Sequence, residues 1–375
     1  MSEMIYLDHN ATSPLRPEAV AAISAAMTIV GNGSSVHAGG RAARKAIEQS
    51  RDAIAELCSA DRDMVTFTSG GTEANNLVVA GAGCSRILIS AVEHPSIKDA
   101  SESAEVIPVT AEGVINLDAL EELLKSSSAT TLVSIMYANN ETGVIQPVEQ
   151  AAELARQYGA IVHCDAVQAA GKIPIDVKSL GVHLLSLSSH KIGGPAGSGA
   201  LINIEGVPVS PTFLGGGQEK KVRSGTENLI GIVGFGAAAA AVNAGGLGEI
   251  ANIKAWRDEL EARALDSVRD LRIVASATKR LANTSCLVSP GIDSETQVMA
   301  MDLAGICISA GSACSSGKVG VNPVMTAMGF DDAEARSVIR VSLGWSTKQS
   351  DIDAFLGAWC GLHERTLNRN VAIAS

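Results

Sequence analysis

The stretch SLSSHKIGGPAGSGA, residues 186–200, runs from the end of an apolar segment into a glycine-rich turn that carries one lysine, Lys191. On both sides of it, from about Arg41 onward, short runs rich in β-branched residues alternate with amphipathic segments of Ala, Glu and Arg. This alternation is typical of strands joined by crossover helices in a mainly parallel sheet. The sequence therefore predicts an α/β fold in which ligands bind where the strands end.

The elements of this large unit are expected from their residue patterns. Strands are predicted at Met64–Thr68, Arg86–Ser90, Thr131–Tyr137, Ile161–Asp165, Leu184–Ser188 and Gly199–Ile202. Helices are predicted at Arg41–Ser59, Thr72–Ala80, Leu117–Lys125 and Pro147–Tyr158. The apolar, alanine-rich segment Leu229–Val242 is far shorter than the roughly 20 residues that span a bilayer, so it predicts a buried helix and no membrane partner.

A change of composition marks the expected domain boundary. The glycine-rich segment NAGGLG, Asn243–Gly248, predicts a break, and a charged amphipathic helix is expected after it from about Ile250 to Arg269. Further strands are predicted at Arg272–Ala275, Thr284–Leu287 and Val338–Ser342. We expect residues 12–245 to form a large domain with a mainly parallel mixed sheet flanked by helices, and residues 1–11 and 246–375 to form a smaller α+β domain.

Composition excludes several functional classes. The 375 residues include 29 Lys plus Arg against 40 Asp plus Glu, a net charge of −11, which argues against a nucleic-acid partner. The seven cysteines are odd in number and contain no CxxC pair, so neither a disulfide framework nor a cysteine-rich zinc site is expected. Glu3 and Asp8 stand where a signal peptide would need basic and then apolar residues, so a cytoplasmic location is the expectation.

Lys191 is the first candidate for chemistry. A single lysine is most often a solvated surface residue. Here, however, Ser188, Gly193 and Gly194 leave room for a planar ligand to approach the backbone, which favours a lysine that forms a Schiff base. A carbonyl cofactor such as pyridoxal 5′-phosphate (PLP) is the natural partner of such a lysine.

Two further motifs supply what PLP would need. Asp165 ends an apolar strand and Gln168 follows it, so a carboxylate is available for the pyridinium nitrogen, although a strand-end Asp could equally cap the next helix. TFTSGGTEANN, residues 66–76, combines a strand, a glycine turn and a helix start, and its free N–H groups with the Thr72 hydroxyl form an anion cradle. A simple capped helix would explain the same residues.

An ordered set of motifs extends over nearly the whole chain. The set comprises YLDHNATSP, GNGSSVH, TSGGTEANN, EHPS, NNETG, HCDAVQ, SSHKIGGP, RSGTEN, GSACSSG and IRVSLG. In this order it resembles the NifS/IscS-type cysteine desulfurases, of the class V aminotransferase group within PLP fold-type I. The resemblance implies that the chain is a PLP-dependent enzyme that removes sulfur from L-cysteine and releases L-alanine.

The resemblance also assigns roles to individual positions. It makes Lys191 the covalent cofactor lysine, which also moves the α-proton, and it makes His94 a residue that stacks on the ring and takes part in proton transfer. The other implied cofactor contacts are Gly71, Thr72, Asn140, Asp165, Gln168, Ser188, His190 and, from a second subunit, Thr226. The implied substrate contacts are Arg340, as a bidentate clamp on the carboxylate, with Asn140, Asn10 and Asn32. A homodimer with sites at the subunit boundary is therefore expected.

Cys314 is the remaining implied catalytic residue. It lies in ISAGSACSSGKVGVNPV, a segment rich in Gly and Ser that is typical of a mobile loop, and Lys318 nearby would favour its thiolate. A lone cysteine is more often an inert buried residue, and the other six are interpreted in that way. In the family this position attacks the substrate sulfur and carries it as a persulfide. No intrinsic metal is expected, since the Cys314 persulfide would meet an iron–sulfur cluster only in transit.

Departures from the family pattern leave some questions open. Gly33 stands where the family usually has proline, and WCGLHERTLNRNVAIAS lacks the longer tail with which housekeeping members dock a scaffold protein. The expected sulfur acceptor is an iron–sulfur scaffold, a tRNA-thiolation relay or a nitrogenase-linked system. The alternative functions are a selenocysteine lyase, another class V PLP aminotransferase, or a binding protein that has kept the fold without the cofactor.

Overall fold

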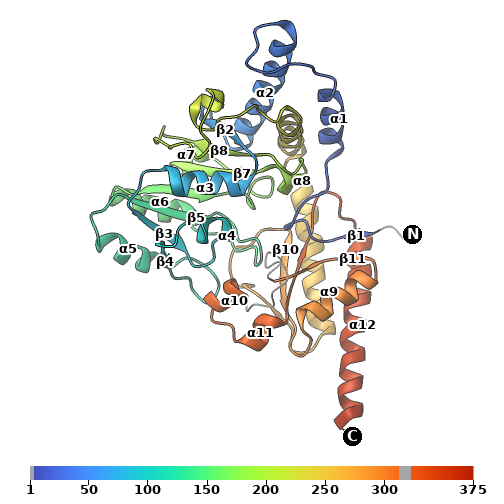
Figure 1. The fold of residues 1–375 in the computed structure, drawn as a ribbon. Coiled ribbons are helices and arrows are strands. Elements are labelled where there is room, and N and C mark those ends of the chain that lie inside the picture. The colour runs from blue at the N-terminus through green and yellow to red at the C-terminus, as the bar shows by residue number, and fades with distance from the viewer. Residues whose placement is uncertain (1–3, 312–321, 375) are drawn as a thin grey trace.

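A large mixed sheet forms the centre of the molecule (Figure 1). The computed structural model describes residues 4–311 and 322–374. The strands of this sheet are β2 (Val65–Thr68), β3 (Arg86–Ser90), β4 (Glu105–Ile107), β5 (Thr131–Met136), β6 (Ile161–Asp165), β7 (Leu184–Ser188) and β8 (Gly199–Asn203). They lie in the order β2-β8-β7-β6-β5-β3-β4, and within the described residues only β8 runs antiparallel to its neighbours.

Helices cover both faces of this sheet, which explains why its strands are rich in aliphatic residues. They are α1 (Pro17–Ala26), α2 (Ala38–Leu57), α3 (Gly71–Gly81), α4 (Pro95–Lys98), α5 (Leu117–Lys125), α6 (Val148–Gln157) and α7 (Val177–Leu180). Short 3-10 turns lie at η1 (Arg62–Met64), η2 (Ser189–Lys191) and η3 (Gln218–Lys221). Every residue of β5 and β7 is buried, as expected for parallel strands covered on both faces.

Helix α8 (Leu229–Ser267) connects the large sheet to the rest of the chain. The predicted break at Asn243–Gly248 takes the form of a bend, because α8 is helical throughout while its halves Leu229–Gly245 and Gly248–Ser267 meet at 80°. Glycines tolerate such bends and weaken the straight helix. The first half is the predicted buried, alanine-rich helix, with Ala238 and Ala239 fully buried. No single helix of the described residues could cross a membrane, and only the two bent halves of α8 together meet that test, by length and composition.

Small side chains bring the first half of α8 close to its neighbours. A Cβ atom on Gly236 would lie 2.5 Å from Cα of Ser50 in α2, and one on Gly234 would lie 2.8 Å from the side chain of Ile23 in α1. Larger residues would therefore force these helices apart. Aromatic residues make up only 3% of the chain, which agrees with close packing of small and aliphatic side chains.

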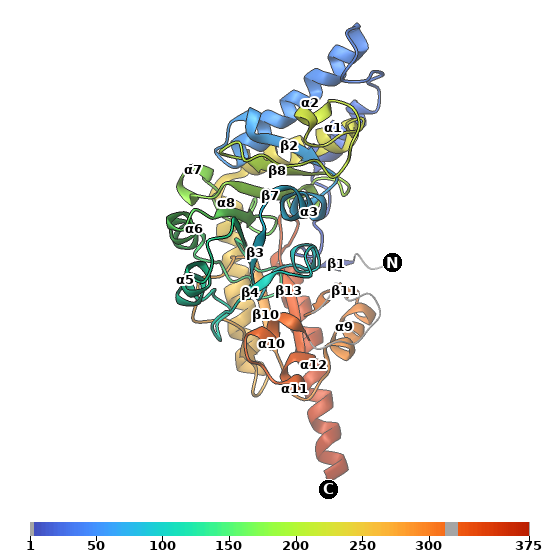
Figure 2. The ribbon, with the colours of Figure 1, turned by 60° about the vertical axis from the view of Figure 1, so that its left-hand side comes forward.

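A second group of elements packs below the large sheet (Figure 2). Its sheet has the order β12-β13-β10-β9, with β9 (Arg272–Ile273), β10 (Thr284–Val288), β12 (Ser309–Ala310) and β13 (Val338–Ser342) paired antiparallel. Its helices are α9 (Ser294–Leu303), α10 (Pro323–Ala327), α11 (Asp332–Arg336) and α12 (Gln349–Ala374), the last of which projects away from the body. The N-terminal strand β1 (Ile5–Tyr6) pairs in parallel with β11 (Ile306–Cys307).

Buried apolar clusters hold these parts together. One lies around the large sheet, and another joins Leu7, the second half of α8 and the buried rings of Phe355 and Trp359. A third cluster places Val92, in the loop after β3, and Met136, the last residue of β5, against Val288 of the smaller sheet. The contact between the two sheets is therefore apolar, and it fixes the residues that lie between them.

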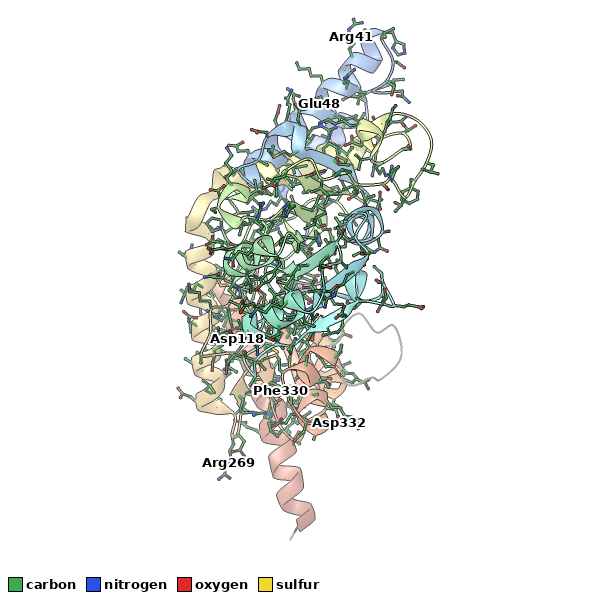
Figure 3. The ribbon with its side chains drawn as sticks, turned by 90° about the vertical axis from the view of Figure 1, so that its left-hand side faces the viewer. Arg41, Glu48, Asp118, Arg269, Phe330 and Asp332 are labelled. Atoms are coloured by element: carbon green, nitrogen blue, oxygen red, sulfur yellow. The ribbon has the colours of Figure 1, made fainter. Side chains whose placement is uncertain are left out.

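Charged side chains such as Arg41 and Arg269 extend outward at opposite ends of the molecule (Figure 3).

The described cysteines behave as structural residues. Cys58, Cys84, Cys164, Cys286, Cys307 and Cys360 are all free thiols. Burial raises the pKa of each, to about 12 for Cys58. A raised pKa disfavours the reactive thiolate. These six residues therefore fit the inert role expected for them, while Cys314 lies outside the described residues.

Candidate active site

A cavity of about 400 Å³ lies where strands of the large sheet end against the smaller sheet. The residues that line it and that the sequence singled out are Asn10, Gly71, Thr72, His94, Asn140, Asp165, Gln168, Ser188, His190, Lys191 and Arg340. They come from seven separated stretches of the chain. Their convergence on one cavity is therefore a property of the fold and not of local sequence.

The carboxyl ends of neighbouring parallel strands deliver the central residues. β6 ends at Asp165, β7 ends at Ser188, and η2 then carries Lys191 directly after β7. The turn beyond Lys191 needs glycine, because Gly193 has φ of +87° and a Cβ there would lie 2.6 Å from Arg16 Cγ. The local sequence thus fixes a tight turn after Lys191 and leaves the lysine at the cavity wall.

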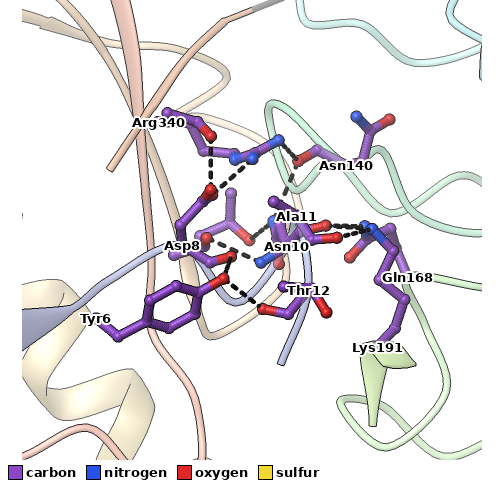
Figure 4. Close-up of polar contacts among 12 residues, drawn as sticks. Tyr6, Asp8, Asn10, Ala11, Thr12, Asn140, Gln168, Lys191 and Arg340 are labelled. Atoms are coloured by element: carbon purple, nitrogen blue, oxygen red, sulfur yellow. Dashed lines mark hydrogen bonds and ion pairs between the residues drawn. The ribbon is translucent and has the colours of Figure 1, made fainter. Parts of the chain in front are cut away.

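Lys191 contacts the N-terminal segment (Figure 4). Its Nζ donates to the carbonyl oxygens of Asn10 at 2.5 Å and Ala11 at 2.7 Å. The smaller sheet also holds this N-terminal segment, because the backbone N–H of Asn10 donates to Ser342 Oγ at 3.0 Å. The lysine is therefore positioned by contacts from both parts of the molecule.

Asp165 is a buried carboxylate, 6% exposed, held by neutral donors. Asn75 Nδ2 donates to its Oδ2 at 2.7 Å, and the Val167 backbone N–H donates to its Oδ1 at 2.9 Å. None of the ion pairs among the described residues includes Asp165. Burial, and then the negative charge of Asp165, raises the pKa of neighbouring Glu93 well above its ordinary value.

His94 precedes α4 and caps it. Its Nδ1 accepts from the Ser96 backbone N–H at 3.1 Å and lies 2.8 Å from Ser96 Oγ. Burial lowers the pKa of His94, as does Lys191, while Asp165 raises it. The ring is therefore neutral at pH 7, and its proton is on Nε2 because Nδ1 accepts the backbone donor. This arrangement suits a residue that gives and takes a proton at Nε2.

Arg340 in β13 is 2% exposed and forms the opposite wall of the cavity. Its Nη2 donates to Asp8 Oδ1 at 2.7 Å and its Nη1 to the Asn140 carbonyl oxygen at 3.0 Å. Its Nε is buried without a hydrogen-bond partner among the described residues. A guanidinium group with a buried, unused donor at a cavity is suited to binding a carboxylate.

The cavity residues fit PLP. A Cβ on Gly71 would lie 2.8 Å from Val167 Cγ2 and 3.4 Å from Ser188 Cβ, so only glycine leaves the backbone open at the start of α3. The first turn of that helix presents unpaired N–H groups next to Thr72, Ser188 and His190, a set suited to a phosphate. The Asp165 carboxylate, without a cationic partner in the described part of the chain, suits a pyridinium nitrogen.

Three residues singled out in the sequence do not line this cavity. Asn32 and Thr226 are exposed, and they lie in adjoining segments, since a Cβ on Gly33 would be 3.9 Å from Glu227 Oε2. Thr226 was expected to serve a second subunit, so its position outside this chain's own cavity is compatible with that expectation. Cys314 lies outside the described residues.

Sequence reasoning missed several residues that complete the site. Asn75 holds Asp165, Asp8 pairs with Arg340, and Lys172 donates to Gln168 Oε1 at 2.6 Å. All of these missed residues lie in or next to motifs that were noted. Nothing in the sequence indicated that Asp8 pairs with Arg340, which lies more than three hundred residues away. For Lys172, the spacing of four residues from Gln168 was an available signal.

Residues 5–355 match the model of the class-V aminotransferase family, and the chain belongs to that family. Members of this family are PLP-dependent enzymes, which agrees with the fit of the cavity. Within the family the chain belongs to the cysteine desulfurases of NifS/IscS type, which confirms the expected fold class and family.

Relatives and solved structures support this placement. The chain is 38% identical to the IscS-like cysteine desulfurase of Mycobacterium tuberculosis, with 99% of each chain covered. It is 41% identical to a cysteine desulfurase of Cereibacter sphaeroides, with 94% of each covered. The X-ray structure of a NifS-like protein from Rickettsia africae superimposes with a TM-score of 0.90 at 38% identity, covering 96% of this chain and all of that one.

Proposed function

We propose that this chain is a PLP-dependent cysteine desulfurase that converts L-cysteine to L-alanine and retains the sulfur as a persulfide on Cys314. The observation that carries the proposal is the convergence of Lys191, Asp165 and Arg340 on one cavity. These residues provide an amine, a carboxylate and a guanidinium group, which are the groups needed to hold PLP and an amino acid. The names of the relatives support sulfur removal as the reaction.

The chain's residues divide the work of holding the cofactor. When bound, PLP supplies an aldehyde that takes up amines and a ring that withdraws electrons from the substrate. Lys191 holds it covalently, and the carbonyl oxygens of Asn10 and Ala11 position the lysine Nζ. Asp165, oriented by Asn75, holds the ring nitrogen in its protonated state. The N–H groups at the start of α3 bind the phosphate.

We assign substrate binding to Arg340, on the opposite wall of the cavity, and proton transfer to Lys191 and His94. Arg340 would bind the substrate carboxylate with its buried Nε and an adjacent nitrogen, which would hold the substrate in one orientation. Lys191 would take the α-proton at Nζ. His94 donates and accepts a proton at Nε2 while Ser96 holds its Nδ1.

The sulfur step is proposed for Cys314. Its thiolate forms a sulfur–sulfur bond to the substrate thiol as the substrate carbon–sulfur bond breaks, and the bonding electrons stay with the three-carbon fragment. Protonation of that fragment completes alanine. The sulfur atom remains on Cys314 as a persulfide until an acceptor thiol takes it.

The test is alanine release from L-cysteine together with mass spectrometry of the peptide that bears Cys314. We expect one added sulfur atom on this peptide, an absorbance band near roughly 400 nm from the lysine-bound cofactor, and loss of alanine production in Cys314→Ala. Cys307→Ala is the matched control, because Cys307 is a partly buried free thiol that should not react. Undiminished desulfuration in Cys314→Ala would refute the proposal.

The same experiment separates the alternatives. An ordinary class V aminotransferase would release product equally well in the Cys314→Ala variant. A selenocysteine lyase would turn over selenocysteine far faster than cysteine. A binding protein that had kept the fold would show no cofactor absorbance at all.

We propose further that the enzyme works as a homodimer with shared sites. Three apolar side chains are almost fully exposed: Val30 at 85%, Val36 at 88% and Leu214 at 84%. Apolar surface of this kind is typical of a protein–protein interface. Asn32 and Thr226, exposed in neighbouring segments, would complete the partner's cavity. Sedimentation of the wild type should give a dimer, and Leu214→Glu should weaken it. A monomeric wild type that turns over cysteine would refute the shared site.

We propose a cytoplasmic enzyme that passes its sulfur to an iron–sulfur scaffold or another acceptor protein. The net charge of −11 argues against direct binding of nucleic acid, and a persulfide on Cys314 would be a form in which sulfur passes to another thiol. The test is mass transfer: a purified scaffold protein mixed with the persulfide form should gain sulfur. Absence of transfer to any protein thiol would contradict this part.

A further inference from the structure

Asn10 is buried beside the active-site cavity, and its side chain uses every donor and acceptor it has. The residue is 1% exposed. Its Nδ2 donates to the Asn140 carbonyl oxygen at 3.1 Å and to Thr284 Oγ1 at 2.9 Å. Its Oδ1 accepts from Asn283 Nδ2 at 3.0 Å and from Lys172 Nζ at 2.9 Å. A side-chain amide has two donor hydrogens and two acceptor lone pairs, so none is left over for a substrate.

Three of these residues form a closed ring of hydrogen bonds. Asn10 donates to Thr284, the Thr284 hydroxyl donates to Asn283 Oδ1 at 3.0 Å, and Asn283 Nδ2 donates back to Asn10 Oδ1. The ring joins Asn10 to the smaller sheet, because Thr284 begins β10. Since each donor in the ring meets an acceptor, the orientation of the Asn10 amide is fixed.

Both walls of the cavity are joined to Asn10. On one side, its backbone carbonyl oxygen accepts from Lys191 Nζ at 2.5 Å and from Gln168 Nε2 at 2.9 Å. On the other side, the Asn140 carbonyl oxygen that accepts from Asn10 Nδ2 also accepts from Arg340 Nη1 at 3.0 Å. One hydrogen bond therefore leads from Asn10 to the lysine and two lead from it to the arginine (Figure 4).

We propose that Asn10 is a positioning residue that sets Lys191 and Arg340 relative to each other, and that its side chain does not contact the substrate. This role replaces the substrate contact that the resemblance implied at Asn10. A displaced amine would bind the cofactor less well, and a displaced guanidinium group would bind the substrate carboxylate less well, so loss of the Asn10 side chain should affect both. The inference rests on the proposed roles of Lys191 and Arg340.

Thr284 offers a way to disturb Asn10 without touching the cavity. It is fully buried, and it is not among the described residues that line the cavity. Thr284→Val keeps the shape of the side chain and removes one acceptor of the Asn10 amide. Asn10→Ala removes all four side-chain contacts and leaves the backbone carbonyl oxygen that accepts from Lys191.

The test measures two quantities in the full-length protein: the dissociation constant of PLP without substrate, and kcat/KM for L-cysteine at saturating PLP. In Asn10→Ala we expect PLP to bind about tenfold more weakly and kcat/KM to fall about tenfold. In Thr284→Val we expect changes of about threefold in the same directions. The double variant should be no worse than Asn10→Ala alone, because Thr284 acts through Asn10.

Thr131→Val is the matched control, because Thr131 is a buried threonine at the start of β5 whose hydroxyl donates to the Ala129 carbonyl oxygen at 2.8 Å. It should change neither quantity. If Asn10→Ala does not fold, Thr284→Val decides alone: a parallel change in both quantities supports the inference, and no change in either overturns it.

Two other results would overturn the inference. A lower kcat/KM in Asn10→Ala with an unchanged PLP dissociation constant is the result expected of a substrate contact. Effects of Asn10→Ala and Thr284→Val that simply add in the double variant would show that the two residues act separately. Failure of the wild type to produce alanine would contradict the proposed reaction, and the PLP measurements would still decide the role of Asn10.

Discussion

Two buried arginine–carboxylate pairs lie in different regions of the molecule and differ in how fully their donors are used. Arg51 of α2 binds Glu219 through both Nη atoms at 2.8 Å, donates to the Val65 carbonyl oxygen and lies over the Phe67 ring. Arg340, equally buried, binds Asp8 through one nitrogen only.

The difference lies in what each arginine leaves unused. Arg51 uses its remaining nitrogen, Nε, to contact Glu48. The Glu219 carboxylate that pairs with Arg51 also accepts the Phe67 backbone N–H at 2.8 Å. Arg340 keeps a buried Nε without a partner in the described part of the chain, at the wall of a cavity. A saturated pair holds elements together, whereas an unsaturated pair beside a cavity remains able to bind a ligand.

The largest expected effect is on the saturated pair. Arg51→Met leaves the Glu219 carboxylate buried without its cation, so the free energy of unfolding should fall by about 3–5 kcal/mol. Denaturant unfolding measures this loss, and the KM for cysteine of the folded fraction should not change. The control is Arg62→Met, whose exposed pair with Asp52 should contribute less than about 1 kcal/mol. Equal losses in both variants would remove the distinction between the pairs.

The second effect is on the unsaturated pair. Arg340→Met should lower kcat/KM for L-cysteine by about a hundredfold, equivalent to about 2.7 kcal/mol of transition-state binding, because the substrate carboxylate loses its partner. Steady-state kinetics measure this change, and the cofactor absorbance should persist because Arg340 does not hold PLP. Arg340→Lys should recover only part of the activity, since an ammonium cannot form the bidentate contact. Wild-type kinetics in the Met variant would assign Arg340 a purely structural role.

The third prediction concerns a carboxyl that faces Arg340 without pairing with it. Burial raises the pKa of Glu141 to about 7, and Asn322 is its hydrogen-bond partner. A carboxyl with a raised folded-state pKa binds more protons when folded, so its contribution to stability is complete below about pH 4.5 and is lost as the pH rises through 7.

Glu141→Gln removes this titration. Relative to the wild type, its free energy of unfolding should therefore rise by roughly 2 kcal/mol between pH 5 and pH 8. Denaturant unfolding at a series of pH values measures the difference between the two proteins, in which the titrations of other groups cancel. A difference that does not vary with pH would show that Glu141 is ionised in the folded protein throughout this range.

The smallest effect is expected at Asp8. Asp8→Asn leaves the charge of Arg340 uncompensated, so the KM for cysteine should fall by about threefold as attraction for the carboxylate increases. Ser309 Oγ donates to Asp8 Oδ2 at 2.8 Å and should still hold the asparagine in place. A rise in KM would instead show that Asp8 matters mainly for orienting the guanidinium group.

Much of the fold could be predicted because its signals are local. The bounds expected for Arg86–Ser90, Leu117–Lys125, Ile161–Asp165 and Val338–Ser342 are those observed. Each segment has a strong periodic or apolar pattern that ends at polar or turn-forming residues. The continuity of α8 through Asn243–Gly248 was not foreseen, because the cost of glycine in a helix is small enough for packing to offset it.

The site was predictable where a motif carries its own chemistry, as at Lys191 and Asp165. It was not predictable where the function of a residue depends on a distant partner. Nothing near Asp8 in the sequence indicates Arg340, and a lysine such as Lys172 looks like a surface residue until the fold places it against Gln168 and Asn10. Such pairings arise from the topology, which single-sequence patterns do not contain.

The position of the N-terminal segment sets the order of events during synthesis. Asp8 and Asn10 are synthesised more than three hundred residues before their partners Arg340 and Ser342. At typical translation rates the interval is roughly 20 to 60 seconds. The large sheet can form in that time, but the wall of the cavity that carries Arg340 cannot. A nascent chain that has not yet reached Arg340 therefore lacks the guanidinium group proposed to bind the substrate carboxylate, so it would not turn over cysteine.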